Sequence, residues 1–213
     1  MNEKDHTLEF PTVTDVIELN RSGPDYYLSN KFNTGERYMP YRFLSIPSDA
    51  MQKATERGSH VHMCASDYAK QLYPYWKANA EILPWMEQFD DFWTTCKCKL
   101  LATEERCSSA IHQYRGRLDF RLIMHHGLTG KEHEAVSDLK TGQRPSNTQP
   151  NYDAIQTQAY RSCYMQEMRR YALYLTDHSW KLIEHKERTD YSGWQGMLYH
   201  YKWVMKQRNL KGG

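Results

Sequence analysis

Apolar residues recur at helical spacing in the first third of the chain. One stripe runs from residue 49 to about residue 73 and is interrupted by Gly58. Its members are Met51, Ala54, Val61, Ala65, Ala69 and Leu72. This spacing predicts a long helix with one face on a core. A second helix is predicted to begin just after Pro11, with Thr14 as its N-cap.

The pattern changes to alternation in the middle of the chain. The predicted strands cover residues 96–103, 110–125, 134–141, 171–175 and 180–184. Two more helices are predicted over residues 152–168 and 194–207. This order of elements is typical of an α/β fold with a central mixed β-sheet flanked by helices. The 213 residues suffice for one domain, 1–213, in which residues 1–47 form a helical and irregular N-terminal extension.

The predicted strand around residue 118 has two different faces. Its even positions are small or apolar: Tyr114, Gly116, Leu118, Phe120, Leu122 and Met124. Its odd positions carry charge: Arg115, Arg117, Asp119 and Arg121. Since successive side chains of a strand point to opposite faces, the even set is predicted to lie in the core. The simplest interpretation of the odd set is a half-exposed face on which arginine and aspartate pair.

The following strand favours a chemical role for this face. Asp138 and Lys140 share one side of it, while Leu139 between them points to the core. A hairpin over residues 125–133 would make the strands neighbours and bring Asp119 near Asp138. Two carboxylates suit Mg²⁺ or Mn²⁺, and a lysine beside them can orient water or meet charge on a phosphate. The pattern therefore predicts a metal centre that could act on a phosphate, although an Asp-x-Lys triplet alone is weak evidence.

Composition narrows the setting. With 39% hydrophobic and 13% aromatic residues, the chain can bury a sizeable core. The mean hydropathy is −0.86, and no apolar run reaches the roughly 18 residues that a bilayer span requires. The charged first ten residues do not match a secretory signal, so we expect a cytoplasmic protein. Residues 161–213 hold ten Lys/Arg against five Asp/Glu, which suits either a phosphate backbone or an ordinary solvated surface.

The cysteines do not indicate a metal site or a disulfide framework. There are five, which is an odd number in a chain without an export signal. Cys96 and Cys98 are separated by one residue, which matches neither the CxxC redox motif nor a standard zinc knuckle. We expect free, buried thiols.

Four short motifs occur in order along the chain. They are Gly58-Ser-His-Val-His62 on a helix, Gly116-Arg-Leu-Asp119 on a strand, Asp138-Leu-Lys140 on the next strand and Gln156-Thr-Gln-Ala-Tyr160 on a helix. Each motif is weak alone. Together, over residues 58–160, they resemble the PD-(D/E)XK nuclease superfamily, specifically its RecB-like branch with the lambda-type phage exonucleases. This resemblance implies a restriction-endonuclease-like core, with the "PD" reduced to Leu118-Asp119.

The resemblance also implies a role for each matched residue. His62, Asp119 and Asp138 would be metal ligands, joined by the backbone carbonyl of Leu139. Mg²⁺ or Mn²⁺ is the expected cofactor, with two ions in the site. Lys140 would position or activate the attacking water.

A second set of residues is expected around this centre. Gln156 and Tyr160, one helical turn apart, would brace the site or touch the DNA backbone, or else pack in the core. Arg115, Arg117 and Arg121 are candidates for gripping phosphates, with pairing to acidic side chains as the alternative.

Several neighbouring residues are weaker candidates. His60 competes with His62, but two residues along a helix place it about 160° away around the axis. Glu104 or Glu105, one strand earlier, could add a carboxylate, but neither is included in the predicted site. Iron–sulfur members of the superfamily carry a cysteine cluster after the nuclease motifs. Only Cys163 follows Tyr160, so no cluster is expected.

The leading hypothesis is a metal-dependent DNA exonuclease in phage or mobile-element recombination or repair, acting in the host cytoplasm if phage-encoded. The expected partners are DNA, a single-strand annealing or recombination protein and further copies of the chain, with no membrane. One alternative is a structure-specific or restriction-like endonuclease on the same fold. Another is a nucleic-acid-binding protein on a decayed nuclease fold, against which the intact Asp119, Asp138 and Lys140 argue.

Overall fold

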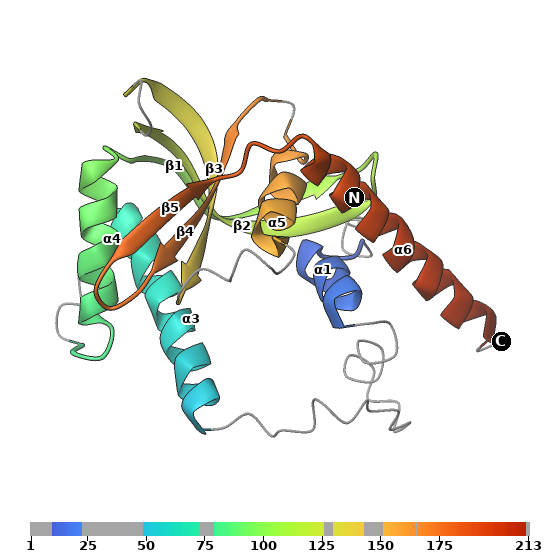
Figure 1. Ribbon diagram of the computed structural model, residues 1–213, viewed down its shortest axis with the longest axis horizontal. Coiled ribbons are helices and arrows are strands. Elements are labelled where there is room, and N and C mark those ends of the chain that lie inside the picture. Colours follow the sequence, from blue (N-terminus) through green and yellow to red (C-terminus); the bar gives the residue numbers. More distant parts are fainter. Residues whose placement is uncertain are drawn as a thin grey trace, which may run out of the picture.

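A five-stranded mixed sheet forms the centre of the computed structural model, which describes residues 10–22, 49–72, 79–125, 130–142, 151–164 and 166–211 (Figure 1). The strands lie in the order β1-β2-β3-β4-β5. They are β1 Lys99–Ser109, β2 Tyr114–His125, β3 Glu132–Thr141, β4 Arg169–Leu175 and β5 Trp180–Glu184. β3 and β4 run parallel, and the other neighbours are antiparallel. The predicted α/β fold with a central mixed sheet is confirmed.

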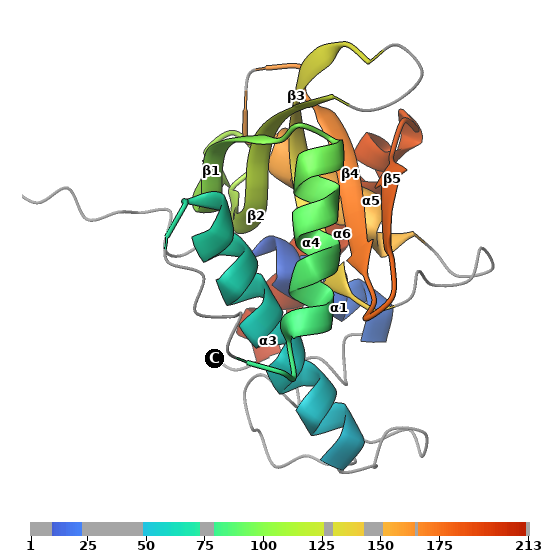
Figure 2. The ribbon, with the colours of Figure 1, turned by 90° about the vertical axis from the view of Figure 1, so that its left-hand side faces the viewer.

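Helices cover both faces of this sheet. α3 (Asp49–Ala69) and α4 (Leu83–Thr95) pack on one face, and Figures 1 and 2 show them side by side. α1 (Val13–Ser22), α5 (Tyr152–Arg161) and α6 (Thr189–Lys211) form the layer on the other face. Each layer has its own hydrophobic core, so the sheet is buried between two apolar clusters.

The core under α3 and α4 is largely aromatic. Met86, Phe89 and Phe92 are buried along one side of α4. The ring of Phe89 lies 5.6 Å from that of Phe120 on β2, a contact that joins the helix to the sheet. Val61 and Ala65 bring α3 into the same cluster.

The second core includes part of the predicted N-terminal extension. Val13, Val16 and Leu19 of α1 are fully buried beside Trp194 of α6, whose ring lies 4.9 Å from Tyr114. α1 is therefore part of the domain. Residues 1–9 and 23–48 of the expected extension lie outside the described residues.

The prediction of Thr14 as the N-cap of α1 was wrong. The helix begins at Val13, and Thr12 and Asp15 cap each other. Thr12 Oγ1 accepts from the Asp15 N–H at 3.1 Å, while Asp15 Oδ2 accepts from the Thr12 N–H at 3.3 Å. This reciprocal pair satisfies two N–H groups at the start of the helix.

α4 was not predicted at all, although its sequence contains the signals of a helix. Pro84 stands in its first turn, and the buried residues Met86, Phe89 and Phe92 follow at three-residue spacing. Four aromatic residues within thirteen weakened the helical pattern, because such residues are equally typical of strands.

Other element boundaries shift by several residues. β1 covers Lys99–Ser109 instead of 96–103, because α4 and its cap occupy the chain up to Cys96. Residues 110–113 form the turn between β1 and β2 instead of a strand. α5 ends at Arg161 rather than at 168, β4 begins at Arg169 rather than at 171, and α6 extends beyond 194–207 at both ends.

The cysteines behave as expected. All five are free, and only Cys163 is more than marginally exposed. Within the described segments, no helix has the length and apolar character needed to cross a membrane.

Candidate active site

The predicted site lies where two paired strands separate. The ladder between β2 and β3 runs from His125↔Glu132 to Phe120↔Ser137 and stops there. Beyond this point the N–H of Leu139 donates a 2.7 Å hydrogen bond to Asp119 Oδ2 instead of to a strand partner. The carboxylate of Asp119 therefore replaces the missing ladder bond and is held at the fork between the strands.

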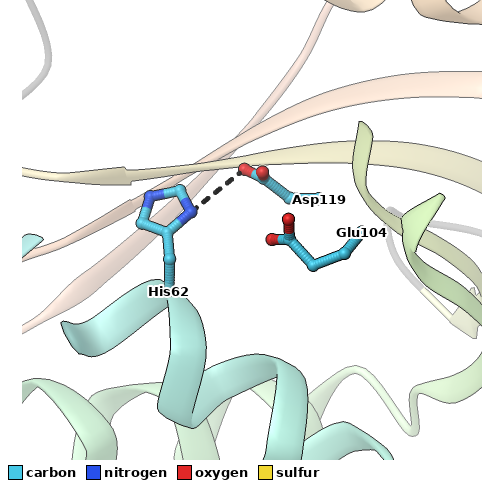
Figure 3. Close-up of side chains that lie close together, drawn as sticks. All are labelled: His62, Glu104 and Asp119. Atoms are coloured by element: carbon cyan, nitrogen blue, oxygen red, sulfur yellow. Dashed lines mark ion pairs between the residues drawn. The ribbon is translucent and has the colours of Figure 1, made fainter. Parts of the chain in front are cut away.

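Three side chains that could hold a metal ion converge beside this fork, and they are called the candidate metal group (Figure 3). His62 comes from α3, Glu104 from β1 and Asp119 from β2, and one ligand atom of each lies within 4.8 Å of the others. His62 Nδ1 is 3.5 Å from Asp119 Oδ2, the pair joined by the dashed line in Figure 3. His60, the competing histidine, is exposed and is not part of this group.

Gly58 allows α3 to come this close to the sheet. A Cβ atom at this position would lie 2.7 Å from Thr141 Oγ1, at the end of β3. A larger residue here would require either the Thr141 side chain or the helix itself to move. The glycine that interrupts the apolar stripe of α3 thus fixes the distance between His62, one turn later, and the carboxylates.

Glu104 has an unusual backbone conformation. Its φ angle of 53° lies in the left-handed region, which costs energy for a residue with a side chain. It stands between the pairs Thr103↔Phe120 and Glu105↔Leu118 of the β1–β2 ladder, opposite Asp119. Its Oε2 is 2.9 Å from Arg117 Nε. The left-handed backbone therefore turns the Glu104 side chain toward His62 and Asp119. The next residue, Glu105, pairs with Arg121.

A buried carboxylate and a lysine form the other half of the site. The side chain of Asp138 is 3% exposed, and its Oδ2 lies 2.6 Å from Lys140 Nζ. Gln156 Nε2 donates to Asp138 Oδ1 at 3.0 Å, and Gln156 Oε1 accepts from Lys140 Nζ at 3.0 Å. Asp153 Oδ1, at 3.7 Å from Lys140 Nζ, adds a second carboxylate, and its other oxygen accepts from the hydroxyl of Tyr174.

These contacts shift the ionisation of the site. Burial raises the pKa of Asp138 to about 7, against the attraction of Lys140 and with the help of the negative charge on Asp119. Burial works against the charge of Lys140, but Asp138, Asp153 and Asp119 outweigh it and raise its pKa. Burial likewise lowers the pKa of His62, but the hydrogen bond and charge of Asp119 reverse this and raise it. Lys140 is thus an ammonium at neutral pH.

Gln156 and Tyr160 lie against this centre from α5. Gln156 Nε2 is also 2.9 Å from the hydroxyl of Tyr160, so one amide links the tyrosine to Asp138. The Tyr160 ring fills the space above Gly116, where a Cβ would lie 2.7 Å from Cε1 of the ring. The glycine of the Gly-x-x-Asp motif therefore makes room for the tyrosine of the Gln-x-x-x-Tyr motif.

The site opens into two adjoining hollows that share His62, Arg117, Asp119 and Thr141. The first, of about 950 Å³, is called the basic hollow and contains Arg106, Arg115 and Lys140. The second, of about 800 Å³, is called the α3 hollow and is lined mainly by the small and polar side of that helix and by Glu104. The candidate metal group thus stands where the two hollows adjoin.

The three arginines of β2 have different surroundings. Arg115 lines the basic hollow, and its buried Nε has no hydrogen-bond partner within the described part of the chain. Arg117 lines both hollows and is paired with Glu104. Arg121 contacts Glu105 and Glu134 and lies over the ring of Tyr164, and it lines neither hollow. The expected shared face is therefore correct for Arg115 and Arg117 but wrong for Arg121.

The donor set fits a hard divalent cation. Carboxylate oxygens are the ligands that Mg²⁺ prefers, and an imidazole nitrogen adds affinity for Mn²⁺. The group includes two carboxylates and one histidine, and the buried carboxylate of Asp138, which is paired with Lys140, lines the basic hollow. The side chain of Leu139 is buried in the core, its N–H donates to Asp119, and the residue lines the basic hollow beside Asp138. The role of its backbone carbonyl as a ligand stays a prediction.

Three residues of the site were missed or set aside at the level of sequence. Glu104 had no motif around it, and its position depends on the irregular ladder. Asp153 precedes Gln156 by three residues on α5, a helical spacing that was available as a signal. Arg106 lies on the part of β1 that was not predicted as strand.

No protein-family model matches this chain, and no curated protein is significantly similar to it. Among solved structures, the chain is similar to the crystal structure of SSO0001, with 14% sequence identity and a TM-score of 0.41. The similarity covers 97% of this chain and 79% of that chain.

Proposed function

We propose that this chain is a metal-dependent nuclease that hydrolyses the phosphodiester bonds of DNA. The observation that carries the proposal is the fork between β2 and β3. At this fork Asp119, Asp138, Lys140 and His62 face one open cleft, and each is held by a defined contact. Burying the carboxylate of Asp138 beside Lys140, Asp153 and Asp119 costs free energy. Such a cluster is typical of a functional site, whereas a purely structural histidine or a surface ion pair does not need it.

His62, Glu104, Asp119 and Asp138 would hold the metal ions. When bound, such a cation acidifies water and neutralises the charge that develops on a phosphate. The chain's own contribution is positional. Asp119 is fixed by the Leu139 N–H and Asp138 by Gln156, so both carboxylates are oriented before substrate arrives.

Lys140 would donate hydrogen bonds to the attacking water and to the phosphate oxygens. Because its pKa is raised, it is a hydrogen-bond donor at neutral pH. In the reaction, a water oxygen forms a bond to phosphorus as the bond to one ester oxygen breaks. The products are a phosphate monoester and a free hydroxyl. An ammonium at this position stabilises the negative charge that develops on the phosphate in the transition state.

The basic hollow supplies the contacts to the rest of the substrate. Arg106, Arg115 and Arg117 lie in its lining together with Lys140. Arg115 lines the basic hollow, and its buried Nε has no acceptor among the described residues, so its guanidinium is a candidate for a phosphate contact. Exonuclease action on DNA ends remains the leading form of the proposal.

One observation favours endonuclease action as a second candidate. The α3 hollow continues the cleft on the far side of His62 and Asp119. A strand that enters through the basic hollow therefore has space beyond the point of cleavage. A dead-end pocket would be the arrangement typical of an enzyme that removes only terminal nucleotides.

End-labelled linear duplex, single-stranded DNA and covalently closed circular DNA, each with Mg²⁺, Mn²⁺ or chelator, test the proposal. We expect metal-dependent cleavage of linear DNA that is lost in Asp119→Asn. Cleavage of the closed circle would select the endonuclease, and its resistance the exonuclease. A pure protein that binds DNA with either metal and never cuts it would overturn the proposal in favour of a binding protein.

A further inference from the structure

The outer side of α6 carries two large aromatic side chains in water. Tyr199 is 69% exposed and Trp203 is 60% exposed, whereas Trp194 on the inner side of the same helix is fully buried. The two exposed residues are four positions apart, so they are neighbours on one face. The ring of Trp203 also stacks on His200, with the centroids 6.3 Å apart and the planes 20° apart. Exposed aromatic surface of this size usually marks a binding site.

Beyond its first turn, where Asp190 pairs with Arg170, the charge of this helix is of one sign. From residue 191 to residue 211 the chain contains Lys202, Lys206, Arg208 and Lys211 and no aspartate or glutamate. Lys206 is exposed, and Lys202 Nζ donates to the carbonyl of His112 at 2.8 Å. A positive surface without acids attracts polyanions, and the flat rings offer stacking partners to bases.

The helix is built onto the walls of the cleft. Trp194 and Leu198 of α6 share one core with α1 and α5. The start of α1 and two residues of α5, Gln156 and Tyr160, line the basic hollow. Figure 1 shows α1 and α5 between α3 and α6, so a polymer leaving the basic hollow past α1 or α5 would next meet α6.

We propose that Tyr199 and Trp203, with Lys206, form a second binding surface for single-stranded nucleic acid, outside the cleft. Rings this exposed stack on unpaired bases, because the bases of a duplex are already stacked on one another. The choice of nucleic acid as the ligand rests on the proposed function. A purely apolar patch would suit a second copy of this chain, but the uniform positive charge would repel a copy presenting the same face.

Binding of a fluorescein-labelled oligothymidylate to the full chain in chelator tests the surface without cleavage. We expect Trp203→Ala to weaken binding roughly tenfold, while Trp203→Phe keeps most of the affinity. Lys206→Gln should reduce the slope of log Kd against log salt by about 0.7, the loss of one phosphate contact. Leu101→Ala, at an exposed apolar position on β1, is the matched control and should bind like wild type.

Two results would overturn the inference. One is wild-type affinity in Trp203→Ala. The other is a dimer of the wild-type chain, seen by sedimentation, that Trp203→Ala dissociates without loss of oligonucleotide affinity. If Trp203→Ala weakens binding but no metal supports cleavage, the surface stands and the proposed nuclease function fails. If the chain cleaves DNA and Trp203→Ala binds normally, the nuclease stands and the surface fails.

Discussion

At the scale of single residues, the site combines groups that are costly to bury with groups that offset the cost. Asp138 lies almost without solvent contact, and Lys140 and Gln156 are its polar partners. Its carboxyl binds a proton more tightly in the folded chain than in the unfolded chain, since burial raises its pKa from an ordinary value near 4 to about 7. The site is therefore a place where folding stability is lowered to keep a reactive geometry.

Asp138→Asn is expected to stabilise the metal-free protein above pH 7. Because the folded state holds the extra proton, wild-type stability falls as pH rises from about 4 to about 7 and stays lower above that. Asparagine does not titrate, so the variant avoids this decrease in the free energy of unfolding. We expect it to be more stable than wild type by on the order of 1–2 kcal/mol at pH 8 and by little at pH 4. Urea unfolding in chelator at both pH values measures it. An equal effect at both values would contradict the assigned burial cost.

Asp153 is expected to position Lys140 without touching substrate. Its Oδ1 lies 3.7 Å from Lys140 Nζ, and the hydroxyl of Tyr174 holds its other oxygen. Asp153→Asn should lower kcat about 10-fold with KM nearly unchanged, as is typical of a residue that supports a catalytic one. Asp177→Asn, at an exposed carboxylate that pairs only with His178, is the control. A rise in KM with unchanged kcat would show that Asp153 binds substrate instead.

At the scale of elements, close approaches at two glycines set the geometry of the site. Gly58 lets α3 rest on the end of β3, and Gly116 lets the Tyr160 ring of α5 rest on β2. In each case a Cβ would lie 2.7 Å from a side-chain atom of the neighbouring element. The two glycines thus hold the histidine helix and the Gln-Tyr helix against the strands with the carboxylates.

Gly58→Ala is expected to separate α3 from β3 and impair catalysis. Alanine improves helix propensity by roughly 1 kcal/mol, but the clash with Thr141 Oγ1 moves His62 away from Asp119. We expect at least a 10-fold fall in kcat, and Thr141→Ala in the same chain should restore most of it. Gly196→Ala is the control, since its added Cβ meets nothing within 4 Å. Wild-type kinetics in Gly58→Ala would show that α3 need not touch β3.

The layers and the mixed sheet follow from hydrophobic periodicity, and so they could be predicted. Asp119, Asp138 and Lys140 were placed together correctly because the hairpin and the alternation fix their faces. Glu104 could not be placed from sequence, because its direction comes from a left-handed residue in an irregular ladder. Strict alternation put Arg121 with Asp119, but the two faces of β2 exchange at Asp119, since Leu118 packs in the core of α1, α5 and α6 and Phe120 packs in the core under α3 and α4. Arg121 therefore pairs with Glu105 and Glu134 instead.

At the scale of the whole molecule, one cleft crosses the sheet at the fork, with both helical layers contributing to its walls. α3 supplies one hollow, while α1 and α5 border the other. A cation at the fork would therefore link the two layers. Since it would bind only the folded chain, it should stabilise the entire domain.

Saturating Mn²⁺ is expected to raise the Tm of the protein by roughly 5–10 °C, since 100-fold excess over Kd contributes about 2.7 kcal/mol. His62→Ala and Glu104→Gln should each lose most of this increase. Glu134→Gln, whose carboxylate pairs with Arg121 away from the cleft, should keep it. Equal increases in all four proteins, measured by thermal unfolding, would place the ion elsewhere.

The central claim is that Lys140 and its carboxylates cut DNA, and single-turnover cleavage of end-labelled DNA tests it most directly. With Mg²⁺ or Mn²⁺, the wild-type chain should cut, and chelator should stop it. Lys140→Met should be slower by about 100-fold or more while it still unfolds cooperatively, and Lys131→Met at an exposed position should cut like wild type. Cleavage by Lys140→Met at the wild-type rate would contradict the account.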